Sequence, residues 1–283
     1  MAIDFRVRPP FKGFRTAFGR RGGSTESDEV LIEGFIKRLD EAGITKGVVT
    51  GRNIAGKSGG PDIVVPNEDV AELVRKYPTR FEGFGAVDVR NVPKALDELD
   101  KIAGLGLKGV AFDNPWSNPA LYDDDKSLFP IYEKSSQLKL IVGLTASAFI
   151  GPDISYSNPA HVQRVASAFP ELTIVVPHGS WPWTTQIAAV LIESKLRGAS
   201  NIYILPDVYL NPPGVPGRQD YIDLINWTFL GKQQLFDRVL FASSFPAQDP
   251  LDAVRDFKQI DGIAPEIRDA ILFKNAERIL GLA

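Results

Sequence analysis

The sequence contains no cysteine, which excludes disulfides, thiolate metal sites and cysteine nucleophiles. It also lacks a strong net charge: 32 lysines and arginines stand against 35 aspartates and glutamates, so the basic excess that binds nucleic acid or anionic membranes is missing. No apolar run approaches about 18 residues, and the first residues do not form a basic segment followed by an apolar one. We therefore expect a cytoplasmic protein with no nucleic-acid or membrane partner.

Eight short runs rich in β-branched and apolar residues recur along the chain, most of them followed by a stretch of helical period. They cover residues 2–8, 47–51, 84–87, 108–113, 138–144, 173–178, 201–207 and 238–244. Most are apolar almost throughout, as strands buried on both faces of a parallel sheet are. Eight strand–helix units without a break in composition predict one α/β domain over residues 1–283, a (β/α)₈ TIM barrel. An open doubly wound sheet is the alternative.

The first predicted strand carries charge where a buried strand is normally apolar. In MAIDFRVRPP, Asp4, Arg6 and Arg8 alternate with apolar residues, and strand geometry places alternate positions on one face. These side chains therefore form either a buried ion cluster or one wall of a site. In a barrel, chemistry gathers where the strands end. The polar residues at those ends are Arg6, Arg8, Arg52, Asn53, Asp88, Asp113, Asn114, Thr145, His178, Asp207, Ser243 and Ser244.

Four stretches of the sequence together carry a family pattern: IDFRVRPP, VVPHGSWPW, VLFASSFP and ILFKNAERILGL. The first resembles the I-D-x-H-x-H first strand of the amidohydrolase-related (amidohydrolase 2) family of the amidohydrolase superfamily. The others are similar to its sixth-strand histidine, its eighth-strand G-S-D-x-P and its closing helix, in the same order. The resemblance implies hydrolysis of a C–N or C–O bond, lactones included, or decarboxylation of an aromatic acid. It also implies a homodimer or larger homo-oligomer.

Members of this family hold one or two divalent metals, and the resemblance places the ligand positions at Arg6, Arg8, Leu144 (or Thr145), His178 and Ser244. Only His178 is retained as a ligand type, because a guanidinium group stays protonated and has no acceptor. We therefore expect no metal and no other cofactor. Instead, arginines at these positions can bind a carboxylate or phosphate bidentately, with Arg52 as a third partner.

His178 is one of two histidines in the chain and lies at a strand end. An imidazole there can act as general base near neutral pH, with Asp207 orienting it or acting as the base itself, and Arg8 stabilising developing negative charge. The predicted substrate contacts are Arg6, Arg52, Asn53, Asp113, Thr145, Trp181 and Ser244. The structural alternative is a buried network in which Asp4, Asp88 or Asp113 pairs with the arginines.

The sequence is compatible with three functional hypotheses. The first is a metal-independent hydrolase of a small carboxylate-bearing substrate. The second is a hydrolase or decarboxylase whose metal, such as zinc, is held in a relocated site of His178, Asp113 and Asp207. The third is a barrel without catalytic activity that binds an acidic metabolite. No P-loop or Rossmann G-x-G-x-x-G motif stands in a suitable place, so no nucleotide cofactor is expected.

Overall fold

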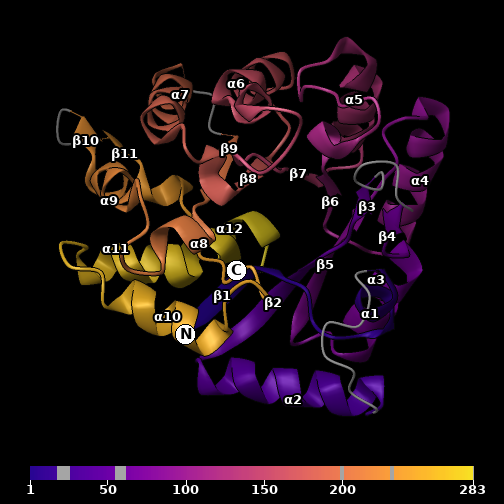
Figure 1. Cartoon of the computed structure of the whole chain (residues 1–283), viewed down its shortest axis with the longest axis horizontal. Coiled ribbons are helices and arrows are strands. Elements are labelled where there is room, and N and C mark those ends of the chain that lie inside the picture. The colour runs from indigo at the N-terminus through magenta and orange to yellow at the C-terminus, as the bar shows by residue number, and fades with distance from the viewer. Residues whose placement is uncertain (18–25, 55–61, 198–200, 230–232, 283) are drawn as a thin grey trace.

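Seven parallel strands form one sheet that curves around a common axis (Figure 1). The structure, a computed structural model, describes residues 1–17, 26–54, 62–197, 201–229 and 233–282. The strand order is β1-β2-β5-β6-β7-β8-β9, so the order in the sheet follows the chain. The strands are β1 (Ala2–Val7), β2 (Ile44–Thr50), β5 (Phe81–Ala86), β6 (Gly109–Phe112), β7 (Ile141–Leu144), β8 (Ile174–Pro177) and β9 (Ile202–Leu205).

The segment 239–245 closes the ring between β9 and β1. Leu240 N–H donates to the carbonyl of Ile204 at 3.0 Å on one side, and Phe5 N–H donates to the carbonyl of Phe241 at 2.9 Å on the other. The predicted TIM barrel is therefore confirmed as a nearly closed barrel of parallel strands.

The closing segment is not a regular strand, so the prediction of one over residues 238–244 is wrong in detail. Arg238 lies in a 3₁₀ turn, Phe236–Arg238, before the segment begins. Ser243 N–H donates to the Asp4 carboxylate at 3.0 Å instead of to a neighbouring strand. Ser244 has a φ of 55°, which extended strands do not contain. At this point, polar side-chain contacts thus replace part of the backbone hydrogen bonding that a regular strand would make.

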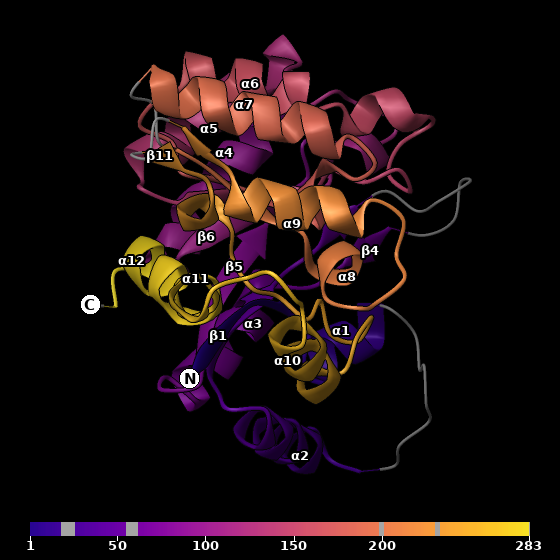
Figure 2. The same ribbon diagram turned by 90° about the vertical axis from the view of Figure 1, so that its left-hand side faces the viewer.

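Helices cover the outside of the ring (Figures 1 and 2). They are α1 (Lys12–Ala17), α2 (Asp28–Glu41), α3 (Asn67–Lys76), α4 (Val92–Gly104), α5 (Phe129–Gln137), α6 (Pro159–Ala168), α7 (Thr184–Leu196), α8 (Asp207–Leu210), α9 (Arg218–Asn226), α10 (Pro250–Lys258), α11 (Pro265–Asp269) and α12 (Asn275–Leu280). Two short antiparallel pairs lie outside the barrel sheet, β3 (Asn53–Ile54) with β4 (Ile63–Val64) and β10 (Thr228–Phe229) with β11 (Gln233–Gln234).

The barrel interior is filled with apolar side chains. One buried cluster takes members from strands around the ring, and these are Ile3, Phe5, Val48, Phe84, Ile141, Val175, Tyr203, Leu205, Leu240 and Ala242. Ala276 and Leu280 of α12 pack against the same cluster. A larger cluster lies between the strands and the outer helices. The barrel is therefore a packed core.

A bulge in β1 changes which side chains face the site. Asp4 pairs with Gly47 and Val7 with Val49, so three steps along β1 match two along β2. The Asp4 carboxylate accepts the Arg6 N–H at 3.2 Å, which diverts that donor from the ladder. The strict alternation expected from the sequence therefore breaks between Asp4 and Val7.

Candidate active site

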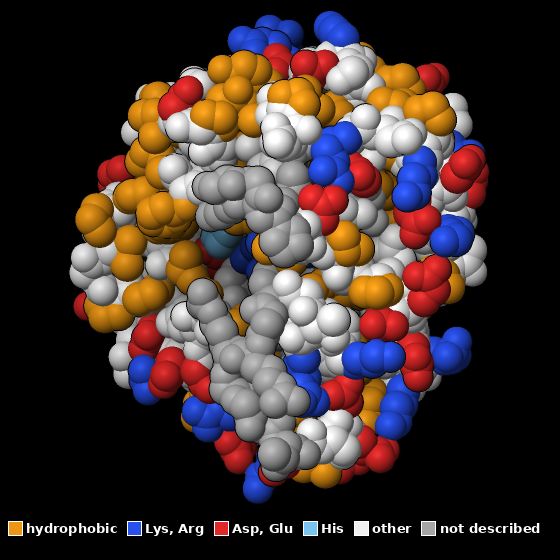
Figure 3. Space-filling model, turned by 45° about the vertical axis from the view of Figure 1, so that its right-hand side comes forward, with side chains coloured by type: hydrophobic (Ala, Val, Ile, Leu, Met, Phe, Trp, Pro, Cys, Tyr) orange, Lys and Arg blue, Asp and Glu red, His pale blue; other side chains and the backbone are white. Residues whose placement is uncertain are grey.

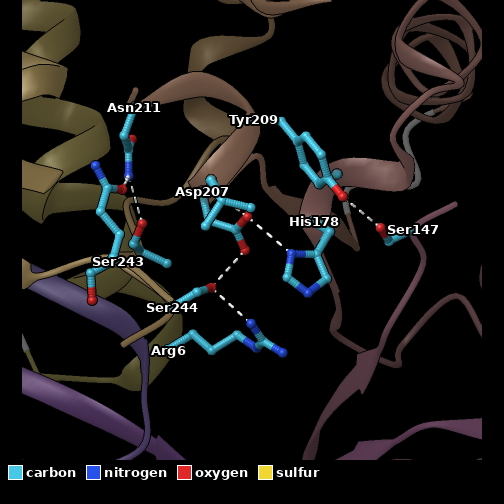
Figure 4. A network of polar contacts seen from close by, with 12 residues as sticks. Arg6, Ser147, His178, Asp207, Tyr209, Asn211, Ser243 and Ser244 are labelled. Atoms are coloured by element: carbon cyan, nitrogen blue, oxygen red, sulfur yellow. Dashed lines mark hydrogen bonds and ion pairs between the residues drawn. The ribbon is translucent and has the colours of Figure 1, made fainter. Parts of the chain in front are cut away.

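Four side chains from neighbouring barrel segments form one hydrogen-bonded chain (Figure 4). His178 follows β8, and its Nδ1 lies 3.0 Å from Oδ1 of Asp207, which follows β9. The hydroxyl of Ser244, in the closing segment, donates to Asp207 Oδ2 at 2.8 Å. The same hydroxyl accepts from Nη1 of Arg6, on β1, at 2.7 Å. One serine thus links a guanidinium group to a histidine–carboxylate pair.

The backbone at this chain of contacts is strained. His178, Asp207 and Ser244 have φ values of 68°, 23° and 55°, a region that residues other than glycine rarely adopt. Tyr221 holds the turn after β8, because its hydroxyl donates to the carbonyl of Gly179 at 3.0 Å. A Cβ at Gly179 would lie 2.9 Å from that hydroxyl, so space as well as its φ of 58° requires glycine there. Strain of this kind gathers at functional sites.

Burial and neighbouring charges set the protonation states of the pair. Burial lowers the pKa of His178, and although Asp207 opposes this, Arg6 and Arg8 add to it. Burial acts to raise the pKa of Asp207, but His178, Arg6 and Ser244 outweigh it and bring that pKa below its usual value. At neutral pH the pair is therefore a neutral imidazole donating Nδ1–H to a carboxylate. Nε2, which carries the lone pair, is then the atom that can accept a proton.

Arg6 and Arg8 place two guanidinium groups within electrostatic range of His178. Arg6 is only 3% exposed, whereas Arg8 is partly exposed. Burial, followed by the charges of Arg6 and Arg52, lowers the pKa of Arg8 well below its usual value. Bringing these positive charges together in a buried site raises their electrostatic free energy, and a bound anion would lower it.

Arg52 is paired with a carboxylate of its own. Its Nε lies 3.1 Å from Asp113 Oδ2, and its guanidinium carbon lies 4.8 Å from the centre of the Trp116 ring. Arg52 and Asp113 are both nearly buried, at 7% and 8% exposure. The structural alternative raised from the sequence, an aspartate paired with an arginine, describes this part of the cluster.

The residues at the family's ligand positions do not fit a divalent metal. The guanidinium groups of Arg6 and Arg8 offer no lone pair, and the Ser244 hydroxyl donates its proton to Asp207. The nearby imidazole and carboxylates are already paired with one another or with an arginine. In the part of the chain that the structure describes, no group of three or more His, Cys, Asp or Glu side chains is arranged to hold a metal. This donor set suits an anion.

An aromatic wall stands beside His178. The ring of Tyr209 meets that of His178 edge-on at 6.0 Å and stacks on Trp181 at 4.7 Å. Phe149, 70% exposed, stacks on Trp181 as well, at 6.1 Å. The Tyr209 hydroxyl is hydrogen-bonded to Ser147 at 2.8 Å (Figure 4). Trp181 therefore contacts the site through Tyr209.

Two more predicted substrate contacts, Thr145 and Asn53, lie after β7 and on β3. Thr145 is buried just after β7, where its N–H donates to the carbonyl of Phe112 at 3.2 Å. Asn53 lies on β3 and lines a polar cavity of about 440 Å³ with Asp88 and Arg90, none of which belongs to the arginine cluster. Two residues near His178 were not singled out from the sequence, namely Ser147 and Tyr221. Neither belongs to a motif, although Ser147 follows a predicted strand end by three positions.

One face of the molecule has a depression. Figure 3 shows a histidine side chain, with a lysine or arginine side chain beside it, at the bottom of a depression.

Among the described residues, no helix has the length and apolar character needed to cross a bilayer. The cytoplasmic location and the homo-oligomeric state stay predictions.

Comparison with known proteins establishes the family. A family model described as Amidohydrolase matches residues 60–282. The chain belongs to the amidohydrolase family. The match begins after the segment that carries Arg6 and Arg8, so it covers the strand ends of His178, Asp207 and Ser244 but not the first strand.

Among solved structures, an uncharacterized TIM-barrel protein from Bordetella bronchiseptica is 30% identical, with a TM-score of 0.82 over 99% of this chain and 98% of that one. Gamma-resorcylate decarboxylase from Polaromonas sp. is 24% identical over 252 residues, which cover 76% of this chain and 75% of the relative. A shorter alignment matches 2-amino-3-carboxymuconate-6-semialdehyde decarboxylase from Dictyostelium discoideum. The two sequences are 32% identical over 88 residues, which cover 31% of this amidohydrolase-family chain. The alignment spans only 24% of that protein's length.

Proposed function

We propose that this amidohydrolase-family protein hydrolyses a small carboxylate-bearing substrate, at a C–N bond or a C–O bond such as that of a lactone, without a metal ion. The observation that carries the proposal is the His178–Asp207 pair in one cluster with the guanidinium groups of Arg6 and Arg8. Hydrolysis of an anionic substrate needs a base to activate water and a cation to bind the anion.

In this reaction His178 Nε2 takes a proton from water while the water oxygen attacks the acyl carbon. Asp207 stabilises the imidazolium that forms and keeps the ring oriented. The carbonyl π electrons move onto oxygen, where a guanidinium group stabilises the negative charge. When the carbonyl reforms, the C–N or C–O bond breaks, and the leaving nitrogen or oxygen takes the proton from His178. The products are a carboxylic acid and an amine or alcohol, or one hydroxy acid from a lactone.

Decarboxylation is the second candidate, because both curated relatives described above are decarboxylases by name. In that reaction the carboxylate leaves as CO₂ and a proton joins the carbon it leaves. Guanidinium groups stabilise the carboxylate before reaction, which opposes its departure. Because its pKa is lowered, His178 is mostly unprotonated at neutral pH and holds little of the proton that carbon would have to receive. The geometry therefore favours hydrolysis.

The first test is the His178→Asn substitution in the full chain, assayed on carboxylate-bearing lactones, esters and amides. We expect turnover to fall by about 10² to 10⁴-fold, since the proton acceptor is lost. His161→Asn is the matched control: it replaces the only other histidine in the sequence, which lies on α6 with its Nδ1 2.6 Å from Asp124. Undiminished turnover in a folded His178→Asn protein would remove the general-base role.

Metal analysis separates the remaining hypotheses. We expect protein purified without a metal-binding tag to contain no stoichiometric metal by mass spectrometry and to keep its activity in chelator. Stoichiometric zinc or manganese, with activity that chelator abolishes, would favour the metal-dependent alternative. Release of CO₂ instead of hydrolysis would favour a decarboxylase. Saturable carboxylate binding with no turnover of any kind would favour a barrel without catalytic activity.

A further inference from the structure

Six ionisable side chains act on one another electrostatically in and beside the strand ends: Asp4, Arg6, Arg8, Arg52, Asp113 and Asp207. All but Arg8 are at most 8% exposed. In such a setting water screens poorly, and an unbalanced charge is expensive. The sum of charges in the cluster therefore limits what charge a ligand can bring.

Asp113 removes one cation from this sum. Its two carboxylate oxygens lie 3.1 Å from Arg52 Nε and 3.4 Å from Arg52 Nη2, a side-on pair in which both partners are nearly buried. Trp116 covers the guanidinium face at 4.8 Å. Arg52 is thus held by Asp113 and Trp116 and its charge is balanced within the protein.

Asp207 balances a second cation. It is 1% exposed and is connected to Arg6 through the Ser244 hydroxyl. Asp4 stays protonated at mildly acidic pH, because burial raises its pKa to about 7. Three guanidinium groups against two ionised carboxylates then leave a single positive charge. His178 adds none while its imidazole is neutral.

We propose that the site selects substrates with one negative charge, and that Asp113 sets this limit by neutralising Arg52. The inference rests on the proposed function, because it takes the arginine cluster as the substrate anion site. A monocarboxylate brings the cluster to neutrality. A dicarboxylate would leave one uncompensated negative charge among nearly buried groups, which costs binding free energy. Asp113 is thus a specificity-determining residue and does not itself touch the reacting atoms.

Two probes of nearly the same shape test the charge rule. Isophthalate carries two carboxylates, whereas in 3-carbamoylbenzoate one of them is replaced by a neutral amide. Isothermal titration calorimetry at pH 6 with the full-length protein gives both affinities. We expect 3-carbamoylbenzoate to bind at least about tenfold more tightly than isophthalate, the scale of one unbalanced charge at low screening.

The Asp113→Asn variant should remove this preference. Arg52 then contributes its charge to the cluster, so the sum rises to two and isophthalate should bind about tenfold or more tighter than it does to the wild type. Asp88→Asn is the matched control. Asp88 also pairs with an arginine after a barrel strand, Arg90 at 2.7 Å, but lies outside the cluster. It should leave the ratio of the two affinities unchanged.

The outcomes separate this inference from the proposed function. Equal or tighter binding of isophthalate to the wild type would overturn the charge rule, even if Asp113→Asn fails to fold. An Asp113→Asn protein that binds both probes with an unchanged ratio would overturn the role of Asp113. Selective binding of the monoanion by a protein that hydrolyses none of the carboxylate-bearing lactones, esters and amides would support the charge rule and contradict the proposed reaction. Failure of both probes to bind would overturn the anion site and the inference together.

Discussion

Ser244 serves two charged neighbours with one hydroxyl. It donates to Asp207 and accepts from Arg6, so its proton is already committed. Its φ of 55° adds backbone strain, on the order of 1 kcal/mol or more. The sequence predicts Ser244 as a substrate contact, whereas this geometry supports a positioning role for Asp207 and Arg6.

The Ser244→Ala substitution distinguishes these roles by kinetics. If Ser244 positions Asp207, kcat should fall by about 10 to 100-fold with little change in KM, the scale of a lost hydrogen bond to a charged group. Ser243→Ala is the control, since that hydroxyl accepts from Phe245 N–H at 3.1 Å and, within the described residues, has no hydrogen bond to Asp207 or Arg6. A rise in KM at constant kcat would instead make Ser244 a substrate contact.

At the scale of elements, apolar periodicity located seven strands, but it started one of them, β7, three residues too early and two others too late. The predicted strands start at positions 47 and 84, whereas β2 begins at Ile44 and β5 at Phe81. The missed residues include Lys46 and Glu82, which form an ion pair at 3.0 Å across the two strands. Charged residues end an apolar run in the sequence, but in the sheet they balance each other.

The sequence predicts only those features of the candidate site that follow directly from the fold. Parallel strands bring their carboxyl ends to one rim, so His178 and Asp207 were expected near each other, and they are hydrogen-bonded. The sequence does not show which partner each charge takes: Asp113 holds Arg52 because of tertiary packing. Nor does it show the bulge in β1, which follows from a side-chain contact of Asp4.

The helix that ends the described chain also holds the closing segment. Asn275, at the start of α12, is 1% exposed, and its Nδ2 donates to the carbonyls of Phe236 and Val239, both at 2.8 Å. These carbonyls lie where the irregular segment begins. One amide group therefore supplies hydrogen bonds that a regular strand would obtain from its neighbours.

We expect Asn275→Asp to lower the free energy of unfolding by roughly 2 kcal/mol or more, because an oxygen then faces two buried carbonyls. Urea unfolding followed by circular dichroism measures the change. Asn226→Asp is the matched control: its Nδ2 also donates to a carbonyl, that of Gly262 at 3.0 Å, but at an exposed position. A change there should stay within about 0.5 kcal/mol. Equal effects at both positions would contradict the role of Asn275.

At the scale of the whole molecule, two buried carboxyl groups in separate networks make stability depend on pH. Asp4 is fully buried beside the closing segment, and burial raises its pKa to about 7. Asp123 is 1% exposed, accepts from Asn114 Nδ2 at 2.8 Å, and has its pKa raised to about 7 by burial as well. In the unfolded chain both return to an ordinary value near 3.8.

The sign of the effect follows from proton binding. Between pH 3.8 and about 7 the folded protein keeps these two protons while the unfolded chain has lost them, so raising the pH favours unfolding. Each carboxyl contributes up to about 1.4 kcal/mol per pH unit, and above its folded pKa the loss is complete.

Urea unfolding at pH 5, 6, 7 and 8 should show this decline. Asp4→Asn and Asp123→Asn should each flatten it, additively because their networks are separate. Asp97→Asn, at an exposed position on α4, should follow the wild type. Curves for Asp4→Asn and Asp123→Asn that run parallel to the wild type would show that neither carboxyl is held neutral.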